Sequence, residues 1–215
     1  DGGSGTAQAS ASAPGGGAQL MWLDPRIIVW PEVRITSQYR DGEREALGAS
    51  IQAVGQQHPI GVFLVDGEYI GGDGKNRCLE AINRGEASVL CLVRDGSGGD
   101  VLQANIATAL LRGHTNPLNV AETLWAAHEE GMSIKDLAQS AGKSDDWVGK
   151  MLEISQAAPA VKQALGDELI ALGHAELLTQ LETQEEQETA LHKVLQERWT
   201  VAELYAYLSG ADPAD

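Results

Sequence analysis

Strand-like patterns are confined to the first half of the chain, and this segregation limits the folds open to it. Short apolar runs typical of β-strands occur between Trp22 and Val93, most clearly at 60–65 and 88–93. From Leu102 onward the apolar residues recur at helical spacing. Strands followed by a long run of helices predict an α+β protein, with a small α/β unit first and an all-helical unit second.

Composition and turn signals predict the boundaries between these units. Almost all of the first nineteen residues are Gly, Ala, Ser, Gln, Thr and Pro, which cannot bury a core and are expected to be disordered. The glycine-rich segment 95–99 is expected to be a flexible loop that closes the α/β unit. The expected parts are a disordered tail at 1–19, an α/β domain at 20–100, a helical domain at 101–208 and a polar tail at 209–215.

Turn signals also predict the individual elements. Asp66-Gly67 predicts a hairpin turn between strands at 60–65 and 68–70, and Thr200 with Glu203 predicts a capping box at the start of the last helix. Helices are expected at 45–54, 102–112, 117–130, 159–165, 168–181, 184–197 and 200–208.

Residues 133–153 have the spacing of a helix-turn-helix. Ala138 is a small residue where two helices cross closely, Gly142 suits a left-handed turn, and Val148 anchors the second helix in the core. Such a unit binds DNA in many proteins and is a plain structural module in others. The spacing alone leaves both interpretations open.

A glycine-rich loop lies between a strand-like run and a helix-like run. Gly72 and Gly74 allow a close backbone approach, and Lys75 and Arg77 follow at once. The unsatisfied amides of the helix start and these two cations together form a candidate cradle for a phosphate or another anion. The alternative is a tight turn with solvated basic residues, in which Arg77 pairs with Asp73 or Glu80.

The net charge opposes unselective binding to polyanions. The chain carries 31 acidic and 15 basic residues, which gives a net charge of −16. Asp145 and Asp146 open the second helix of the helix-turn-helix, where they suit the helix dipole but repel a DNA backbone. The glutamates at 182–188 are either a solvated face or a surface that binds a protein partner.

Several other classes of protein are not indicated. No apolar run approaches the roughly 18 residues that a membrane span needs, and no signal-like start is present, so we expect a cytoplasmic protein without membrane contact. Cys78 and Cys91 are too few for a disulfide scaffold or zinc site and are expected to be buried free thiols. No metal site is predicted, and His114 and His174 are expected to be structural.

The order of motifs resembles that of the ParB-type partition proteins, over roughly residues 22–208. The segment Gly55-Gln56-Gln57-His58-Pro59-Ile60 is similar to the family's "G-x-x-Q-P-I" element, and Gly74-Lys75-Asn76-Arg77 lies where the family has "G-E-R-R". Arg112 with Asn116-Pro117 resembles the junction "R-x-x-x-N-P", and Gly173-His174-Ala175 resembles "G-H-A".

This resemblance implies a ParB/sulfiredoxin-like domain that binds CTP, with or without Mg²⁺, joined to a helical domain that binds double-stranded DNA. It further implies a homodimer that acts in DNA partition or gene regulation in the cytoplasm, on the nucleoid or a plasmid. The implied nucleotide-binding residues are Gly55, His58, Pro59, Ile60, Gly74, Lys75, Asn76, Arg77 and Arg112. The implied DNA-binding residues are Lys143, Ser144, Trp147 and Lys150.

The chain also departs from the family pattern. Where the family has "E-N-x-x-R", this chain has residues 108–112 with the sequence TALLR, so the carboxylate that would help to hold Mg²⁺ is missing. This argues against hydrolysis, and no catalytic residue is assigned. The alternatives are a nuclease or nucleotide hydrolase of the same fold that uses Lys75 and Arg77, or an adaptor that has lost DNA binding.

Overall fold

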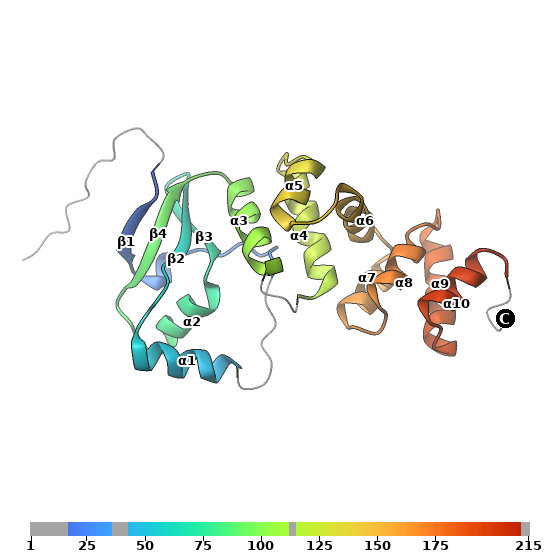
Figure 1. Cartoon of the computed structure of the whole chain (residues 1–215), viewed down its shortest axis with the longest axis horizontal. Coiled ribbons are helices and arrows are strands. Elements are labelled where there is room, and N and C mark those ends of the chain that lie inside the picture. The colour runs from blue at the N-terminus through green and yellow to red at the C-terminus, as the bar shows by residue number, and fades with distance from the viewer. Residues whose placement is uncertain (1–16, 36–42, 112–114, 212–215) are drawn as a thin grey trace, which may run out of the picture.

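The structure, a computed structural model, describes residues 17–35, 43–111 and 115–211. Within these ranges the strands all precede Gly96, and every element after it is a helix (Figure 1). The elements are β1 (Gln19–Leu23), a 3-10 helix η1 (Pro25–Ile27), α1 (Glu43–Val54), β2 (Ile60–Val65), β3 (Glu68–Asp73), α2 (Lys75–Asn83), β4 (Val89–Asp95), α3 (Gly98–Leu111), α4 (Pro117–Glu129), α5 (Ile134–Ala141), α6 (Asp145–Ser155), α7 (Pro159–Gly166), α8 (Leu172–Leu178), α9 (Gln184–Glu197) and α10 (Val201–Leu208).

The four strands form one mixed sheet in the order β1-β4-β2-β3. The strand β1 pairs antiparallel with β4, β2 pairs antiparallel with β3, and β2 runs parallel to β4. The parallel pair requires a crossover, and the crossover contains α2. The predicted turn at Asp66-Gly67 connects β2 to β3, with both residues at positive φ.

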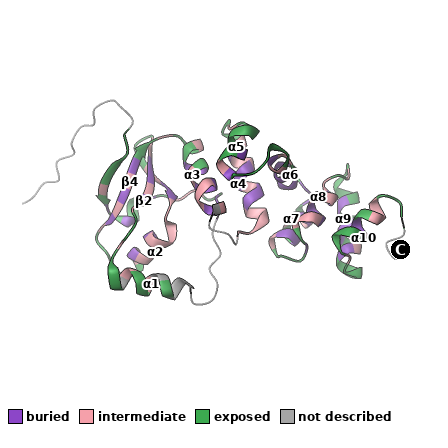
Figure 2. Cartoon of the chain, viewed as in Figure 1, coloured by how far each residue is buried: buried purple, intermediate pink, exposed green. Residues whose placement is uncertain are grey.

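One face of the sheet packs against α2. Val62 and Val93 of the sheet, together with Cys91, form an apolar cluster with Cys78 and Ala81 of this helix. Both cysteines are buried and free, as predicted. In Figure 2, β2, β4 and α2 each carry residues coloured as buried.

A second, larger core lies among the helices from α3 onward. Leu124 of α4, Leu137 of α5 and Met151 of α6 are at most 1% exposed and belong to one cluster that extends to Leu204 of α10. The side chain of Asn105 in α3 bonds both backbone groups of Ile35, at 2.7 and 3.0 Å. The segment before α1 is thereby tied to the helical part. The predicted α+β class is confirmed.

Several element boundaries differ from the sequence predictions. The strand β1 begins at Gln19, inside the segment predicted to be disordered. The strand β3 continues past residue 70 to Asp73, because it stays paired with β2 as far as Gly61, and the Gly71 amide also donates to Val29 O at 2.8 Å. The helix α3 begins at Gly98 within the predicted loop, because Asp100 accepts hydrogen bonds from the Ser97 amide and hydroxyl at 2.8 and 2.7 Å and caps the first turn.

The helix predicted at 168–181 is shorter in the structure, where α8 spans Leu172–Leu178. Glu168 has a φ of 58° and the amide of Leu169 bonds Ala164 O, so the chain turns here before α8 begins. The predicted capping box of Thr200 and Glu203 is present at α10, with the Thr200 hydroxyl donating to the Glu203 carboxylate at 2.7 Å. Within the described ranges, no helix combines the length and the apolar character needed to cross a bilayer.

Candidate functional site

The helices α5 and α6 form the predicted helix-turn-helix. Ser133 caps α5 and Ser144 caps α6, and Gly142 between them has a φ of 63°. Ala138 is 3% exposed and Val148 is fully buried, so both perform the packing roles expected from the spacing. The outer side of α6 is left to solvent, which is the arrangement that a groove-reading helix requires.

The start of α6 combines a cap, an aromatic ring and a cation. The Ser144 hydroxyl accepts from the Trp147 amide at 3.1 Å, and the Lys143 ammonium lies 5.6 Å from the centre of the Trp147 ring. Trp147 is half-buried and packs against the helical core. The ring therefore packs in the fold and also presents its face to the Lys143 ammonium.

Lys150 on α6 is bonded to acidic neighbours. Its ammonium is 3.1 Å from Asp146, one turn earlier, and 3.9 Å from Glu176 of α8. The hydrogen bond that Lys150 donates to Asp146, followed by the charges of Asp146 and Glu176, raises the pKa of Lys150 above its ordinary value. A phosphate that binds Lys150 has to compete with these two carboxylates.

A second candidate site lies at the junction of β3 and α2. Gly74 caps α2 in the left-handed conformation, with a φ of 94° and no side-chain cap to the first amides of the helix. Lys75, Asn76 and Arg77 form the first turn and are all partly exposed. The positive end of the α2 dipole and the two cations therefore coincide at this bend.

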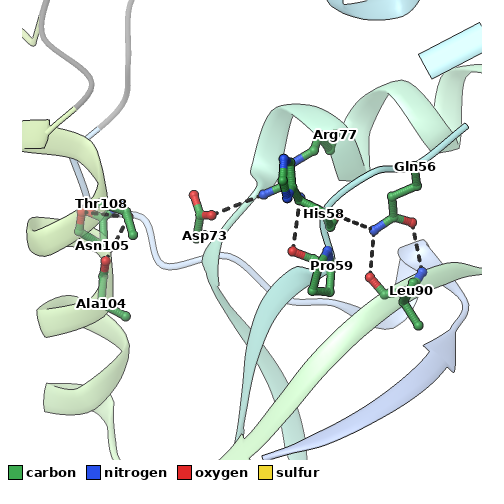
Figure 3. A network of polar contacts seen from close by, with 9 residues as sticks. All are labelled: Gln56, His58, Pro59, Asp73, Arg77, Leu90, Ala104, Asn105 and Thr108. Atoms are coloured by element: carbon green, nitrogen blue, oxygen red, sulfur yellow. Dashed lines mark hydrogen bonds and ion pairs between the residues drawn. The ribbon is translucent and has the colours of Figure 1, made fainter. Parts of the chain in front are cut away.

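Arg77 folds back over the bend, as Figure 3 shows. Its guanidinium donates to the backbone oxygens of His58 and Pro59 and forms an ion pair with Asp73 at 3.1 Å. A Cβ atom at position 74 would lie 2.9 Å from an Arg77 nitrogen, so glycine is required both for the backbone conformation and for this contact. The pairing with Asp73 is the alternative arrangement that the sequence left open, and the cation is not held ready for a ligand.

Arg34 is a further cation at this bend, and the sequence analysis did not single it out. Arg34 is 8% exposed, and its guanidinium lies 5.6 Å from the centre of the Trp30 ring. Among the residues that the structure describes, Arg34 forms no ion pair with a carboxylate. Burial, and after it the charge of Arg34, lowers the pKa of Lys75. An anion bound near Lys75 would offset this repulsion between two partly desolvated cations.

The loop before β2 forms the other wall of this site. Gly55 has a φ of 72°, and the Gln56 side chain bonds both backbone groups of Leu90, at 2.7 and 2.9 Å, which fixes the loop on β4 (Figure 3). His58 is exposed and Pro59 is partly exposed. Ile60 was expected beside the nucleotide, but the whole residue is buried, with its side chain in the sheet core.

The predicted residues fall into two groups that the structure keeps apart. Those at 55–60 and 74–77 lie together around the start of α2, while Lys143, Ser144, Trp147 and Lys150 lie on α6, with α3, α4 and α5 between the two groups (Figure 1). Arg112 and His114 lie outside the described residues. His174 is buried and bonds the Ala171 amide and Trp199 O, at 3.2 and 2.9 Å, which is a structural arrangement.

Comparisons with known proteins agree on one family. The ParB HTH domain family matches residues 114–211. The probable chromosome-partitioning proteins ParB of Vibrio cholerae and Treponema pallidum are 28% and 27% identical to the chain, over 80% and 77% of its length. The chain spans 59% and 52% of these two proteins, a little over half of each.

A solved structure supports the fold. The crystal structure of C-terminally truncated ParB from Caulobacter crescentus, complexed to the centromeric parS site, matches with a TM-score of 0.62 at 21% identity, over 89% of this chain and 100% of that one. The fold and the helix-turn-helix thus define a ParB-type architecture. The resemblance to the ParB-type family is confirmed, and residues 114–211 match the family's helix-turn-helix domain.

Proposed function

We propose that this chain is a DNA-binding protein of the partition type that inserts α6 into the major groove of double-stranded DNA. The observation that carries the proposal is the α5–α6 geometry, with Gly142 in the turn and Val148 in the core, inside the residues that match the ParB helix-turn-helix family. Ser144 and Trp147 at the start of α6, with Lys143 and Lys150, are the proposed DNA contacts. The same DNA binding would also serve in gene regulation.

We also propose that a nucleoside triphosphate, CTP in the family pattern, binds at the start of α2. The chemistry fits an anion, because the first amides of α2 lack a side-chain cap and Lys75 faces the charge of a buried Arg34. Bound CTP would supply the polyanion that neutralises these cations. Gly74 and Asn76 would allow the close approach, and Gly55, His58 and Pro59 would lie toward the base and ribose.

Arg77 joins such a site only by exchanging partners. It has to leave Asp73 and the carbonyls of His58 and Pro59 and bond phosphate oxygens instead. Because those carbonyls belong to the loop on the other wall, the exchange would change how this loop is held. We propose that nucleotide binding changes the conformation of the protein through this loop. We further propose that the protein is a homodimer and that it works in the cytoplasm, on the nucleoid or a plasmid.

Hydrolysis is not part of the proposal. Thr108 lies where the family has the metal-binding glutamate, and its hydroxyl is bonded to Ala104 O at 2.8 Å. Within the described residues, no group of three or more His, Cys, Asp or Glu side chains is placed to hold a metal ion. No observation favours the nuclease or hydrolase alternative, and a Mg²⁺ ion bound with CTP would take its ligands mainly from the phosphates and water.

A salt series of duplex binding tests the DNA proposal. We expect a duplex with a parS site to bind more tightly than a scrambled duplex, and both affinities to fall as salt rises, with about one unit of log–log slope for each phosphate contact. Fluorescence anisotropy between low and physiological salt measures both quantities. Undetectable binding of both duplexes at low salt would instead support the adaptor alternative.

A further inference from the structure

The helix α3 packs against the end of β3, directly before the first turn of α2. A Cβ atom at Gly72 would lie 3.3 Å from the Cβ atom of Ala104, so this part of α3 is in close contact with the strand. In Figure 3, Asp73 is seen between Thr108 of α3 and Arg77 of α2. Side chains of α3 therefore lie beside the residues that are proposed to bind the triphosphate.

The polar side chains around this bend are poorly suited to hold a divalent metal ion. At nucleotide sites Mg²⁺ is usually bound by one or two carboxylates in addition to the phosphates. The Thr108 hydroxyl donates to Ala104 O at 2.8 Å and lies 3.3 Å from Asn105 O. Asp73 carries a carboxylate, but this group is paired with the Arg77 guanidinium at 3.1 Å. The donor set therefore does not fit the Mg²⁺ that commonly accompanies a triphosphate.

Two cations are fixed at the same place. The guanidinium of Arg34 lies over the Trp30 ring, which covers Gly71 so closely that a Cβ atom there would be 2.5 Å from it. The next residue, Ile35, is bonded to α3 through the Asn105 side chain. Lys75 opens α2 close enough to Arg34 for the two charges to repel. Within the described ranges no carboxylate pairs with the buried Arg34, so its charge remains to be neutralised.

We propose that Lys75 and Arg34 take the place of a divalent metal ion at this site, which therefore binds a nucleoside triphosphate in its metal-free form. The two side chains supply two positive charges, as Mg²⁺ does, and they need no carboxylate ligands. A Mg²⁺ ion on the phosphates would neutralise charge that these side chains otherwise neutralise, and both of them would repel it. This inference rests on the proposed nucleotide site and adds which form of the ligand that site selects.

Calorimetric titration of the native chain with CTP, in EDTA and in excess Mg²⁺, tests the metal-free preference. We expect CTP to bind at least as tightly in EDTA as in Mg²⁺, because the protein itself supplies the positive charge. Tighter binding in Mg²⁺, or binding in Mg²⁺ alone, would overturn the proposal and leave the nucleotide site in place. If CTP binds in neither condition, the nucleotide site itself is refuted, and the metal-free preference with it.

Lys75→Glu is expected to make CTP binding depend on Mg²⁺. The new carboxylate repels the phosphates and offers the metal ion a ligand, so the affinity in EDTA should fall about tenfold or more and recover in part when Mg²⁺ is added. Arg84→Glu is the matched control, because Arg84 is exposed at the other end of α2 and its substitution changes the net charge by the same amount. Equal responses of the two variants to Mg²⁺ would contradict the proposal.

Arg34→Met separates a ligand-binding role of this buried cation from a structural one. Methionine keeps apolar packing on Trp30 and removes a buried charge that has no carboxylate partner among the described residues. We therefore expect the melting temperature of the free protein to hold or to rise, while the affinity for CTP in EDTA falls about tenfold or more. An affinity in EDTA equal to that of the native chain would overturn the proposal.

Discussion

Arg77→Ala is expected to weaken the binding of a nucleoside triphosphate about 10- to 150-fold. The lost contact is a charge-assisted hydrogen bond to phosphate, worth about 1.5–3 kcal/mol, which corresponds to that range of affinity. Isothermal calorimetry with CTP, ATP and GTP on native and variant protein measures it. The melting temperature of each protein is measured as well, because Arg77 also bonds Asp73 and the His58 and Pro59 carbonyls, and its loss could lower the stability of the fold.

The partner of this ion pair provides a matched variant. Asp73→Asn removes the carboxylate that competes for the guanidinium, so we expect tighter triphosphate binding than in the native chain. If Arg77 only supports the fold, both substitutions lower the melting temperature and neither changes the dissociation constant. That outcome would remove Arg77 from the proposed site.

Lys150→Glu is expected to lower duplex affinity about 10- to 100-fold at low salt, since one phosphate contact is lost and a repulsive charge is gained. Nucleotide binding is expected to stay unchanged, because α6 and the start of α2 are separate in the structure (Figure 1). Duplex binding by anisotropy and nucleotide binding by calorimetry measure the two effects on the same preparation.

Asp146→Asn is the control for this prediction. Asp146 is exposed and bonds the Lys150 ammonium at 3.1 Å, so its neutralisation releases the cation and removes a negative charge from the same helix. We expect the duplex affinity to rise severalfold, with a steeper dependence on salt. Equal duplex affinities of the native chain and both variants would show that α6 does not face DNA.

Local sequence signals predicted the fold well where packing and turn chemistry agree. Gly142 and Val148 occupy the roles that the helix-turn-helix spacing assigns, and Thr200 caps the helix that it was expected to cap. Ser97 shows the limit of such signals. Its cap with Asp100 begins α3 inside a segment whose glycines predicted a loop.

The candidate anion site was predictable in place but not in detail. Gly74 and Lys75 could be found from the sequence because they adjoin in the chain, whereas Arg34 approaches Lys75 only through the fold. The bonds from Arg77 to the carbonyls of the loop before β2 likewise depend on contacts between residues 18 and 19 positions apart. Ile60 had the motif position of a ligand residue, but the alternation of β2 turns its side chain into the core.

The central claim is that the start of α2 holds a nucleoside triphosphate, and hydrogen–deuterium exchange with and without CTP tests it most directly. The account predicts that CTP slows exchange of the amides at 74–78 and alters it at 55–60, where the loop carbonyls now bond Arg77. Inorganic triphosphate is expected to reproduce the first effect. Saturating CTP that leaves 74–78 unprotected, or that protects another part of the chain instead, would contradict the account.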